Sequence, residues 1–241
     1  NKFRNYKPET EHMPFHYRLL GKDRMALFSF LQSLNTTFGT SIYEPVAKEL
    51  AKTIFREVYT QYKLGNIITH DAQVAIQKIM NDLSNGSEVD KEKETDKIRL
   101  VARTGKTNKL KSVKVDLFLM SKSGEVYMFD LKTVKPNIGD FVYYKRNMLE
   151  WLAVYFYQNP KAQAHTLISI PYNPYEPKPY KRWTMKGMLD LKEEVMVAEE
   201  FWDFLGGKGA YIDLLDCFEK AGVELRPEID NYFSKFKNNQ I

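Results

Sequence analysis

The chain has 241 residues, of which 43% are hydrophobic and 28% charged, a composition that suits a soluble protein with one hydrophobic core, or one core with a helical appendage. Its 36 Lys and Arg against 31 Asp and Glu leave a formal charge of +5, which permits a polyanionic partner without requiring one. The single cysteine, Cys217, excludes an intramolecular disulfide and a thiolate metal cage and suits a reducing cytoplasm. No apolar run approaches the roughly 20 residues of a membrane span, and the first residues lack the apolar stretch of a signal peptide.

The first part of the chain has the apolar spacing of helices. Residues 24–34 form a short amphipathic segment, and a stronger pattern runs from 38 to 65. In that pattern Ser41 and Glu44 have the spacing of a capping box, Pro45 is tolerated in a first turn, and Gly65 would end the helix. A third helix is expected over 69–86, and the charged stretch 87–97 is expected to be a solvated loop.

The period then changes to that of strands. A short strand is expected over 97–103, and two further strands over 112–120 and 126–133, joined by a turn that contains Gly124. A helix is predicted from Phe141 to about Asn159, a strand over 165–173, and helices from 184 onward. The order of helix, strands, helix and strand predicts a mixed α/β core with additional helices at both ends.

Three charged residues lie where the two central strands would be buried. Asp130 and Lys132 are two residues apart and so share a face of one strand, and a hairpin would bring Asp116 of the other strand close to Asp130. Two neighbouring carboxylates repel each other, and a divalent cation removes that conflict. Oxygen ligands suit Mg²⁺, and Lys132 beside it could orient a water or help deprotonate it for attack on phosphorus. An alternative is that Asp116 and Lys132 form an ion pair at the strand ends while Asp130 is a solvated edge residue.

The Asp116…Asp130-Leu131-Lys132 arrangement resembles the PD-(D/E)xK nuclease superfamily, with Val115 in place of its proline. The C-terminal part resembles type II restriction endonucleases, in particular the TdeIII-like group. The resemblance implies a restriction-endonuclease-like α/β fold in a single nuclease domain over 1–241, with a catalytic core at 41–173 and a helical extension at 184–241. It implies Mg²⁺ held by the two carboxylates and the Leu131 carbonyl, products with 5′-phosphates, and a GC-rich site of the GGNCC kind.

In many members of the superfamily an acidic residue on the first core helix completes the metal site. Glu44 is the best match here, and its capping-box role is the alternative. Glu49 and Glu57 follow in the same predicted helix, and either could take the part instead. Lys135 could touch the scissile phosphate, or it could be a plain surface lysine.

Basic residues beside aromatic residues or on loops are candidates for DNA contacts. The Pro- and Tyr-rich loop over 172–183 is a candidate for reading bases, although a structural crossover would have the same composition. A second basic group begins the helix after the motif, and a third precedes the first catalytic strand. The expected DNA-contacting residues are Lys178, Tyr180, Lys181, Arg182, Lys145, Arg146, Lys106 and Lys109.

These observations predict a Mg²⁺-dependent type II restriction endonuclease of a prokaryotic cytoplasm, acting as a homodimer on double-stranded DNA within a restriction-modification system. A two-fold protein on a palindrome provides one active site for each strand. Two alternatives stay open: another nuclease on the same core, for repair or junction resolution, and a non-catalytic DNA-binding protein with structural carboxylates.

Overall fold

A computed structural model describes residues 13–132, 138–180, 185 and 187–237 of the chain. The chain divides into two compact units. The first, here called the sheet unit, runs from Tyr43 to Ala210, and the second, the helical unit, combines Asn1–Ile42 with Tyr211–Ile241. The sheet unit therefore extends well past residue 173, where the predicted catalytic core ends.

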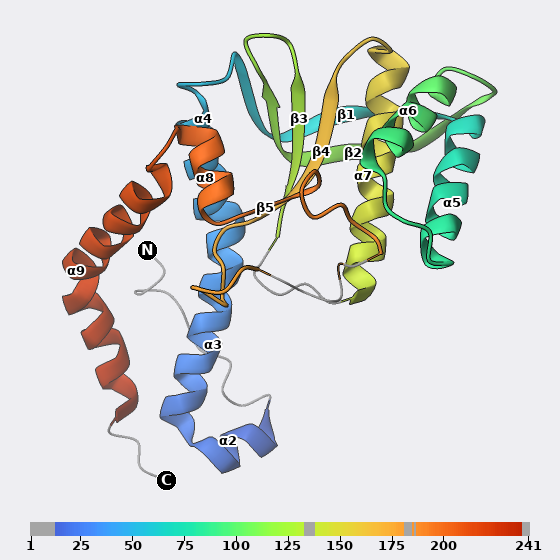
Figure 1. Ribbon diagram of the computed structural model, residues 1–241. Coiled ribbons are helices and arrows are strands. Elements are labelled where there is room, and N and C mark those ends of the chain that lie inside the picture. The colour runs from blue at the N-terminus through green and yellow to red at the C-terminus, as the bar shows by residue number, and fades with distance from the viewer. Residues whose placement is uncertain (1–12, 133–137, 181–184, 186, 238–241) are drawn as a thin grey trace. The chain divides into compact units, whose positions relative to one another are not determined.

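A five-stranded mixed sheet organises the described part of the sheet unit (Figure 1). Its strands are adjacent in chain order: β1 (Glu57–Thr69), β2 (Thr107–Met120), β3 (Val126–Leu131), β4 (Ala164–Ile170) and β5 (Val195–Val197). The first three pair antiparallel, whereas β4 runs parallel to β3 and β5 parallel to β4. This is the mixed α/β architecture expected from the sequence, and it fits a restriction-endonuclease-like core.

Helices cover both faces of the sheet (Figure 1). On one face lie α5 (His70–Ser84), α6 (Lys91–Val101) and α7 (Ile138–Gln158), and on the other lie α4 (Glu44–Ala51) and α8 (Glu199–Gly206). Successive side chains of β3 point to opposite faces of the sheet and pack against the helices on each face. Met128 joins the core under α7, and the ring of Phe129 lies 5.5 Å from that of Phe201 on α8. Both faces of β3 are therefore buried, and a charged side chain on this strand needs a specific partner.

Several predicted elements are confirmed, in some cases with shifted ends. The helix over 69–86 is α5, and the Thr69 hydroxyl caps it by accepting a hydrogen bond from the Ala72 amide at 3.2 Å. The hairpin strands are β2 and β3, and Gly124 in their turn has a φ of 93°, which favours glycine. The strand over 165–173 is β4, and the helix from 141 to 159 is α7.

The prediction of one helix over 38–65 is wrong. Helix α4 ends at Ala51, and Glu57–Thr69 forms β1 along β2. Residues 57–69 are rich in β-branched and aromatic side chains, and pairing with β2 outweighs their helical spacing. Gly65 is not a helix stop; its φ is 143°, and a Cβ there would come within 2.8 Å of the Gln158 amide nitrogen on α7.

Two shorter predictions are also wrong. Most of the expected strand over 97–103, and much of the expected loop over 87–97, belongs to α6, whose first turn is capped by Asp90 accepting from the Lys93 amide at 3.0 Å. The expected all-helical segment from 184 contains β5, which pairs with β4 and extends the sheet. Both errors have the same origin. The conformation of a short segment depends on hydrogen bonds and packing with segments that are distant in the sequence.

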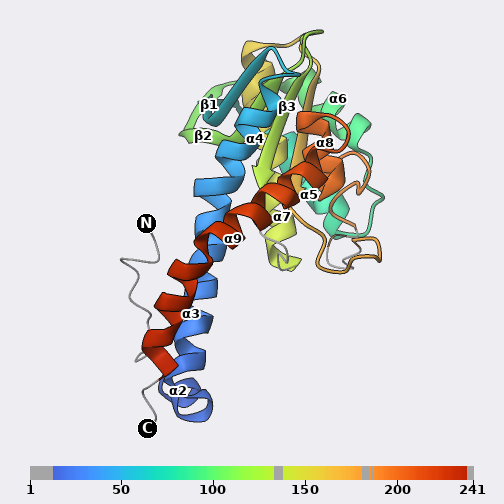
Figure 2. The same ribbon diagram turned by 90° about the vertical axis from the view of Figure 1, so that its left-hand side faces the viewer.

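The helical unit contains α2 (Pro14–Leu20), α3 (Lys22–Thr37) and α9 (Ala210–Lys237) (Figure 2). Aromatic rings join α3 to α9: Phe30 lies 5.0 Å from Tyr232 and 5.5 Å from Phe233, measured between ring centroids. After α3 the chain continues through a π-helical turn, η1 (Phe38–Tyr43), into α4. Among the described residues, no helix combines the length and the apolar character that crossing a membrane would need.

Candidate active site

Asp116 and Asp130 meet where the ladder between β2 and β3 ends. Leu117 is paired with Phe129, so the next position along the strands sets Asp116 opposite Asp130. The Leu131 amide donates a hydrogen bond to Oδ2 of Asp116 at 2.9 Å. The carboxylate of Asp116 therefore lies between the separating strands, next to the second acid of the motif.

Asp130 is buried and paired with Lys132. Its carboxylate is 8% exposed, and its Oδ1 lies 2.7 Å from Nζ of Lys132. Burial raises the pKa of Asp130 from 3.8 to about 7; Lys132 opposes this rise, and Asp116 adds to it. The carboxyl thus holds its proton up to neutral pH in the absence of further positive charge.

Tyr144 of α7 closes the site on the side of Lys132. The Lys132 ammonium lies 4.6 Å from the centre of the Tyr144 ring, a cation–π distance that holds Nζ close to the carboxylates. Burial, together with Asp140 and Asp130, raises the pKa of Tyr144 to about 12. The phenol is therefore neutral, and it acts as a wall of the site rather than as a charge.

Glu44 joins the same site through Gln61. Nε2 of Gln61 donates to Oε1 and Oε2 of Glu44 at 3.1 and 3.0 Å, and to Oδ1 of Asp116 at 3.1 Å. Burial raises the pKa of Glu44; Gln61 lowers it, and Asp116 raises it further. The expected capping box is absent, because α4 begins at Glu44 and its N-cap residue is Tyr43, which makes no side-chain cap hydrogen bond.

The other two candidate glutamates point elsewhere. Glu49 is paired with Lys52 at 2.6 Å on the exposed side of α4. Glu57 begins β1 and lies 3.5 Å from Arg56. Of the three glutamates, Glu44 is therefore the one whose carboxylate is linked to Asp116.

Gln61 was not found by sequence reasoning. Thr60 pairs with Leu117 and Tyr62 with Val115, but Gln61 between them is outside the ladder and has a φ of 52°. A left-handed conformation in a residue other than glycine costs roughly 1–2 kcal/mol. The left-handed residue is the one whose side chain reaches Glu44 and Asp116. No sequence pattern marks this residue, because the conformation depends on the pairing of β1 with β2.

The atoms of the site that could bind a cation are all oxygens. They are the carboxylates of Asp116 and Asp130, the carbonyl of Leu131 at the end of β3, and the Glu44 carboxylate on the far side of Gln61. Within residues 13–132, 138–180, 185 and 187–237, no three His, Cys, Asp or Glu side chains converge closely enough to enclose an ion. Two adjacent carboxylates, one of them resisting ionisation, nevertheless fit a divalent cation that keeps most of its water.

Lys145 does not match its prediction as a DNA-contacting residue. It is fully buried, and its Nζ lies 2.8 Å from Glu194 and 2.5 Å from Glu94. Lys91 reaches the same Glu194 at 2.9 Å. Burial acts to raise the pKa of Glu194, but the two lysines outweigh it and the pKa lies below its usual value. Lys145 is therefore a member of a buried ionic cluster that joins α6, α7 and the segment before β5.

The other expected DNA-contacting residues lie on different parts of the surface. Lys106 and Lys109 are exposed around the start of β2, and Lys178 is exposed after β4. Tyr180 is half-buried, with its ring 5.8 Å from that of Tyr175. Arg146 is half-buried and donates to Gln77 at 2.7 Å. Three predicted residues, Lys135, Lys181 and Arg182, lie outside the described part of the chain.

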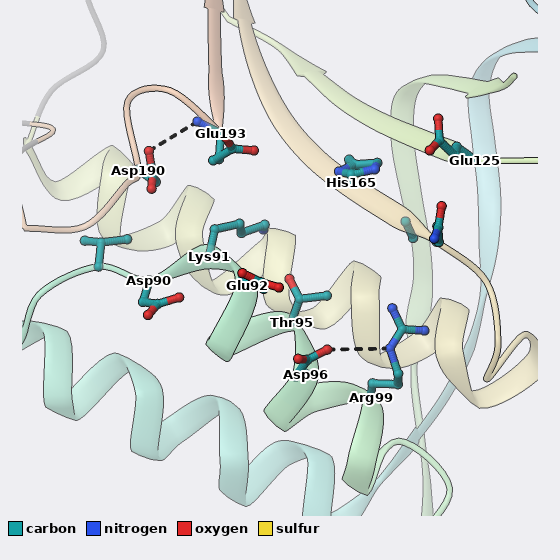
Figure 3. Close-up of a pocket in the computed structure, with 13 residues that line it drawn as sticks. Asp90, Lys91, Glu92, Thr95, Asp96, Arg99, Glu125, His165, Asp190 and Glu193 are labelled. Carbon is teal, nitrogen blue, oxygen red and sulfur yellow. Dashed lines mark hydrogen bonds and ion pairs between the residues drawn. The ribbon is translucent and has the colours of Figure 1, made fainter.

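A separate cavity of about 600 Å³ lies between α6 and the beginning of β4 (Figure 3). Acidic side chains dominate its lining, including Asp90, Glu92 and Glu193, and none of the residues of the candidate site lines it. Its charge repels phosphate groups. This acidic cavity is therefore not the place where DNA would be cut.

The order of elements is a helix with an acidic residue, an antiparallel hairpin with two carboxylates and a lysine, a helix and a parallel strand. This order is consistent with a nuclease of the PD-(D/E)xK type. The family model described as "Type II restriction endonuclease, HinfI" matches residues 1–222. The chain belongs to this family of type II restriction endonucleases, enzymes that cleave DNA phosphodiester bonds at specific sites. The narrower expectation of the TdeIII-like group is not confirmed.

Known proteins of the same class align with most of the chain. This chain is 24% identical over 221 residues to the type II restriction enzyme HgiCII of Herpetosiphon aurantiacus. The alignment covers 90% of this chain and 80% of HgiCII. The chain is 30% identical over 235 residues to the type II restriction enzyme MjaII of Methanocaldococcus jannaschii, covering 90% of this chain and 61% of that enzyme. HgiEI of Herpetosiphon aurantiacus is 22% identical over 220 residues, covering 90% of this chain and 79% of HgiEI.

Proposed function

We propose that this restriction endonuclease uses Asp116, Asp130 and Lys132, with Glu44, to hydrolyse double-stranded DNA with Mg²⁺ and to leave 5′-phosphates. The observation that supports the proposal is the convergence of two carboxylates from neighbouring strands, with a lysine 2.7 Å from one of them and Gln61 bridging the other to a glutamate. A structural ion pair alone would not account for a left-handed glutamine that holds two further carboxylates together.

Each group of the site has a separate role in this proposal. The Asp116 and Asp130 carboxylates and the Leu131 carbonyl would hold the cation, and Glu44 would complete its surroundings. The bound Mg²⁺ would supply positive charge that acidifies water and stabilises the charge that develops on the phosphate. Lys132, held between Asp130 and the Tyr144 ring, would orient the attacking water or donate a hydrogen bond to a phosphate oxygen.

The DNA would be contacted by the exposed basic residues, of which Lys178 is our first candidate for reading bases and Lys106 and Lys109 for contacting phosphates. The recognition site would be a short palindrome of the GGNCC kind, cut by a homodimer with one active site for each strand. The enzyme would work in a prokaryotic cytoplasm beside a methyltransferase that protects the same site.

Asp130→Ala tests the proposal. The variant is expected to lose Mg²⁺-dependent cleavage of plasmid DNA by at least about 1,000-fold while it keeps most of its affinity for DNA in Ca²⁺. Glu49→Ala, on the exposed side of α4, is the matched control and should retain cleavage. Cleavage by Asp130→Ala at the wild-type rate would refute the site.

The digest also separates the alternatives. Discrete bands whose ends map to one palindrome support a restriction enzyme, whereas a smear or cleavage of junctions alone would indicate another nuclease on the same core. Binding without cleavage in Mg²⁺ or Mn²⁺ on any DNA would indicate a non-catalytic DNA-binding protein.

A further inference from the structure

The helical unit leaves large apolar side chains exposed on two of its parts. On α2, Phe15 is 85% and Leu19 82% exposed, and on α9, Val223 is 62% exposed. Exposed apolar residues scattered singly are ordinary, but a concentration on one small unit marks an interaction surface. Among the described residues the exposed set from the residue before α2 to the end of α3 is Met13, Phe15, Leu19, Leu20, Leu27, Phe28 and Leu31, and on α9 it is Ile212, Leu215, Val223 and Leu225.

The exposed residues form strips at helical spacing. On α3, Leu27, Phe28 and Leu31 follow Arg24 at intervals of three, four and seven residues, so they share one side of the helix. On α9, Ile212, Leu215 and Val223 share one side in the same way. Each strip is continuous over about two to three turns, which is the pattern of a helix that packs against another helix.

The two helices of the unit run antiparallel. Phe30 meets Tyr232, and just past the end of α3 the ring of Phe38 in η1 lies 6.0 Å from that of Phe218. Arg24 and Leu27 are therefore near one end of the pair, and Ile212 and Leu215 are near the other. The pair buries only a few side chains, among them Met25, Phe30 and Tyr232, whereas four helices surround a larger core.

The strips carry opposite charge. The α3 strip begins with Arg24, whose Nη1 contacts the Leu20 carbonyl at 2.9 Å and lies 4.0 Å from Asp23, both in its own segment. The α9 strip carries Asp216 and Glu219 between its apolar residues. Over 210–234, α9 has six acidic residues against Lys220 and Arg226, so this surface repels DNA. An antiparallel two-fold arrangement sets each basic end beside the acidic end of the other copy.

We propose that a second copy of this chain covers the helical unit, with the α3 strip of each copy packed against the α9 strip of the other in a four-helix arrangement. The inference rests on the proposed homodimer and identifies its surface. At roughly 200 Å² for a fully exposed large apolar residue, the apolar residues of the two strips expose an area on the order of 600 Å² per copy, and the polar side chains between them add to it. Stable interfaces bury about 800 Å² per partner. The contact is isologous, because both strips are present in each copy.

Sedimentation equilibrium of the full chain in EDTA, without DNA, tests the proposal. The wild type should be a dimer, and Leu27→Lys and Val223→Lys should each raise the dimer dissociation constant by about 100-fold, as expected for buried contacts. Arg24→Glu and Glu219→Arg should each raise it by about tenfold, and the double variant should recover most of the loss. Lys78→Glu, on exposed α5, is the control and should change nothing. Circular dichroism checks that each variant is folded.

A monomeric wild type at tens of micromolar, or a dimer that neither lysine variant weakens, would overturn the assignment. Failure here is distinguishable from failure of the proposed function, because cleavage by the wild type and by Asp130→Ala is measured on the same preparations. A monomer that cuts at a specific site refutes the helical-unit dimer and leaves the active site standing. A dimer that dissociates as predicted, with cleavage that survives Asp130→Ala, supports the surface and refutes the site.

Discussion

Asp130 should make the metal-free enzyme less stable above neutral pH, and Asp130→Asn should relieve this cost. The carboxyl has a pKa of about 7 in the folded protein, against its usual 3.8. Between these values the unfolded chain releases the proton and the folded protein keeps it, so folding loses stability as pH rises. The loss begins near pH 4 and is complete above about pH 7. A neutral amide at the same position has no such dependence.

The size of the effect follows from the shift. The difference between about 7 and 3.8 is roughly three pKa units, and one unit corresponds to about 1.4 kcal/mol, so the carboxylate costs about 4 kcal/mol at pH 8. The pKa of about 7 already includes the ion pair with Lys132, which lowers it, so the loss of that pair is not subtracted a second time. We therefore expect Asp130→Asn to increase the free energy of unfolding by about 4 kcal/mol at pH 8, and by about 1 kcal/mol at pH 4.5.

Thermal and urea unfolding in EDTA, followed by circular dichroism at several pH values, measures the effect. At pH 8 the melting temperature should rise by about 8–16 °C. Asp96→Asn on the exposed side of α6 is the matched control, with an expected change below about 0.5 kcal/mol. A stabilisation that is equal at pH 4.5 and pH 8, or a loss of stability at pH 8, would refute the reasoning.

Two further predictions concern Gln61 and Lys145. Gln61→Leu removes the donor shared by Glu44 and Asp116, and single-turnover cleavage should slow about 10- to 100-fold, while Gln163→Leu, at an exposed position, should cut normally. An unchanged rate in Gln61→Leu would show that the bridge is dispensable. Lys145→Met leaves two buried carboxylates without their shared lysine and should cost about 3–5 kcal/mol in urea unfolding; a cost below about 1 kcal/mol would contradict the assigned ionic cluster.

The hairpin that carries Asp116 and Asp130 could be predicted from the sequence because its signals are local. Alternation along 112–120 and 126–133, with a glycine turn between them, predicts both strands, and the spacing of Asp130 and Lys132 places them on one face. The antiparallel register then brings Asp116 opposite Asp130. Helix α7 and strand β4 followed from patterns of the same kind.

Other parts could not be predicted because they depend on residues far apart in the chain. The helical spacing over 38–65 is real, yet β1 forms there because a hydrogen-bonding partner, β2, lies about 50 residues away. In the sequence, Lys145 stands beside tyrosines and has the features of a surface lysine. Its burial depends on Glu94 and Glu194, each about 50 residues away in the chain. A pattern within one segment contains no information about such partners.

By itself the sequence determined a mixed α/β chain with two acids and a lysine on adjacent strands, because side-chain alternation is a property of the local backbone. Only the tertiary structure decided which glutamate joins them, since Glu44 reaches Asp116 through a glutamine whose left-handed conformation arises at an irregularity in strand pairing. It also decided that one expected DNA-binding lysine is a core residue. Burial and backbone strain are set by contacts between distant segments, and these exist only once the chain has folded.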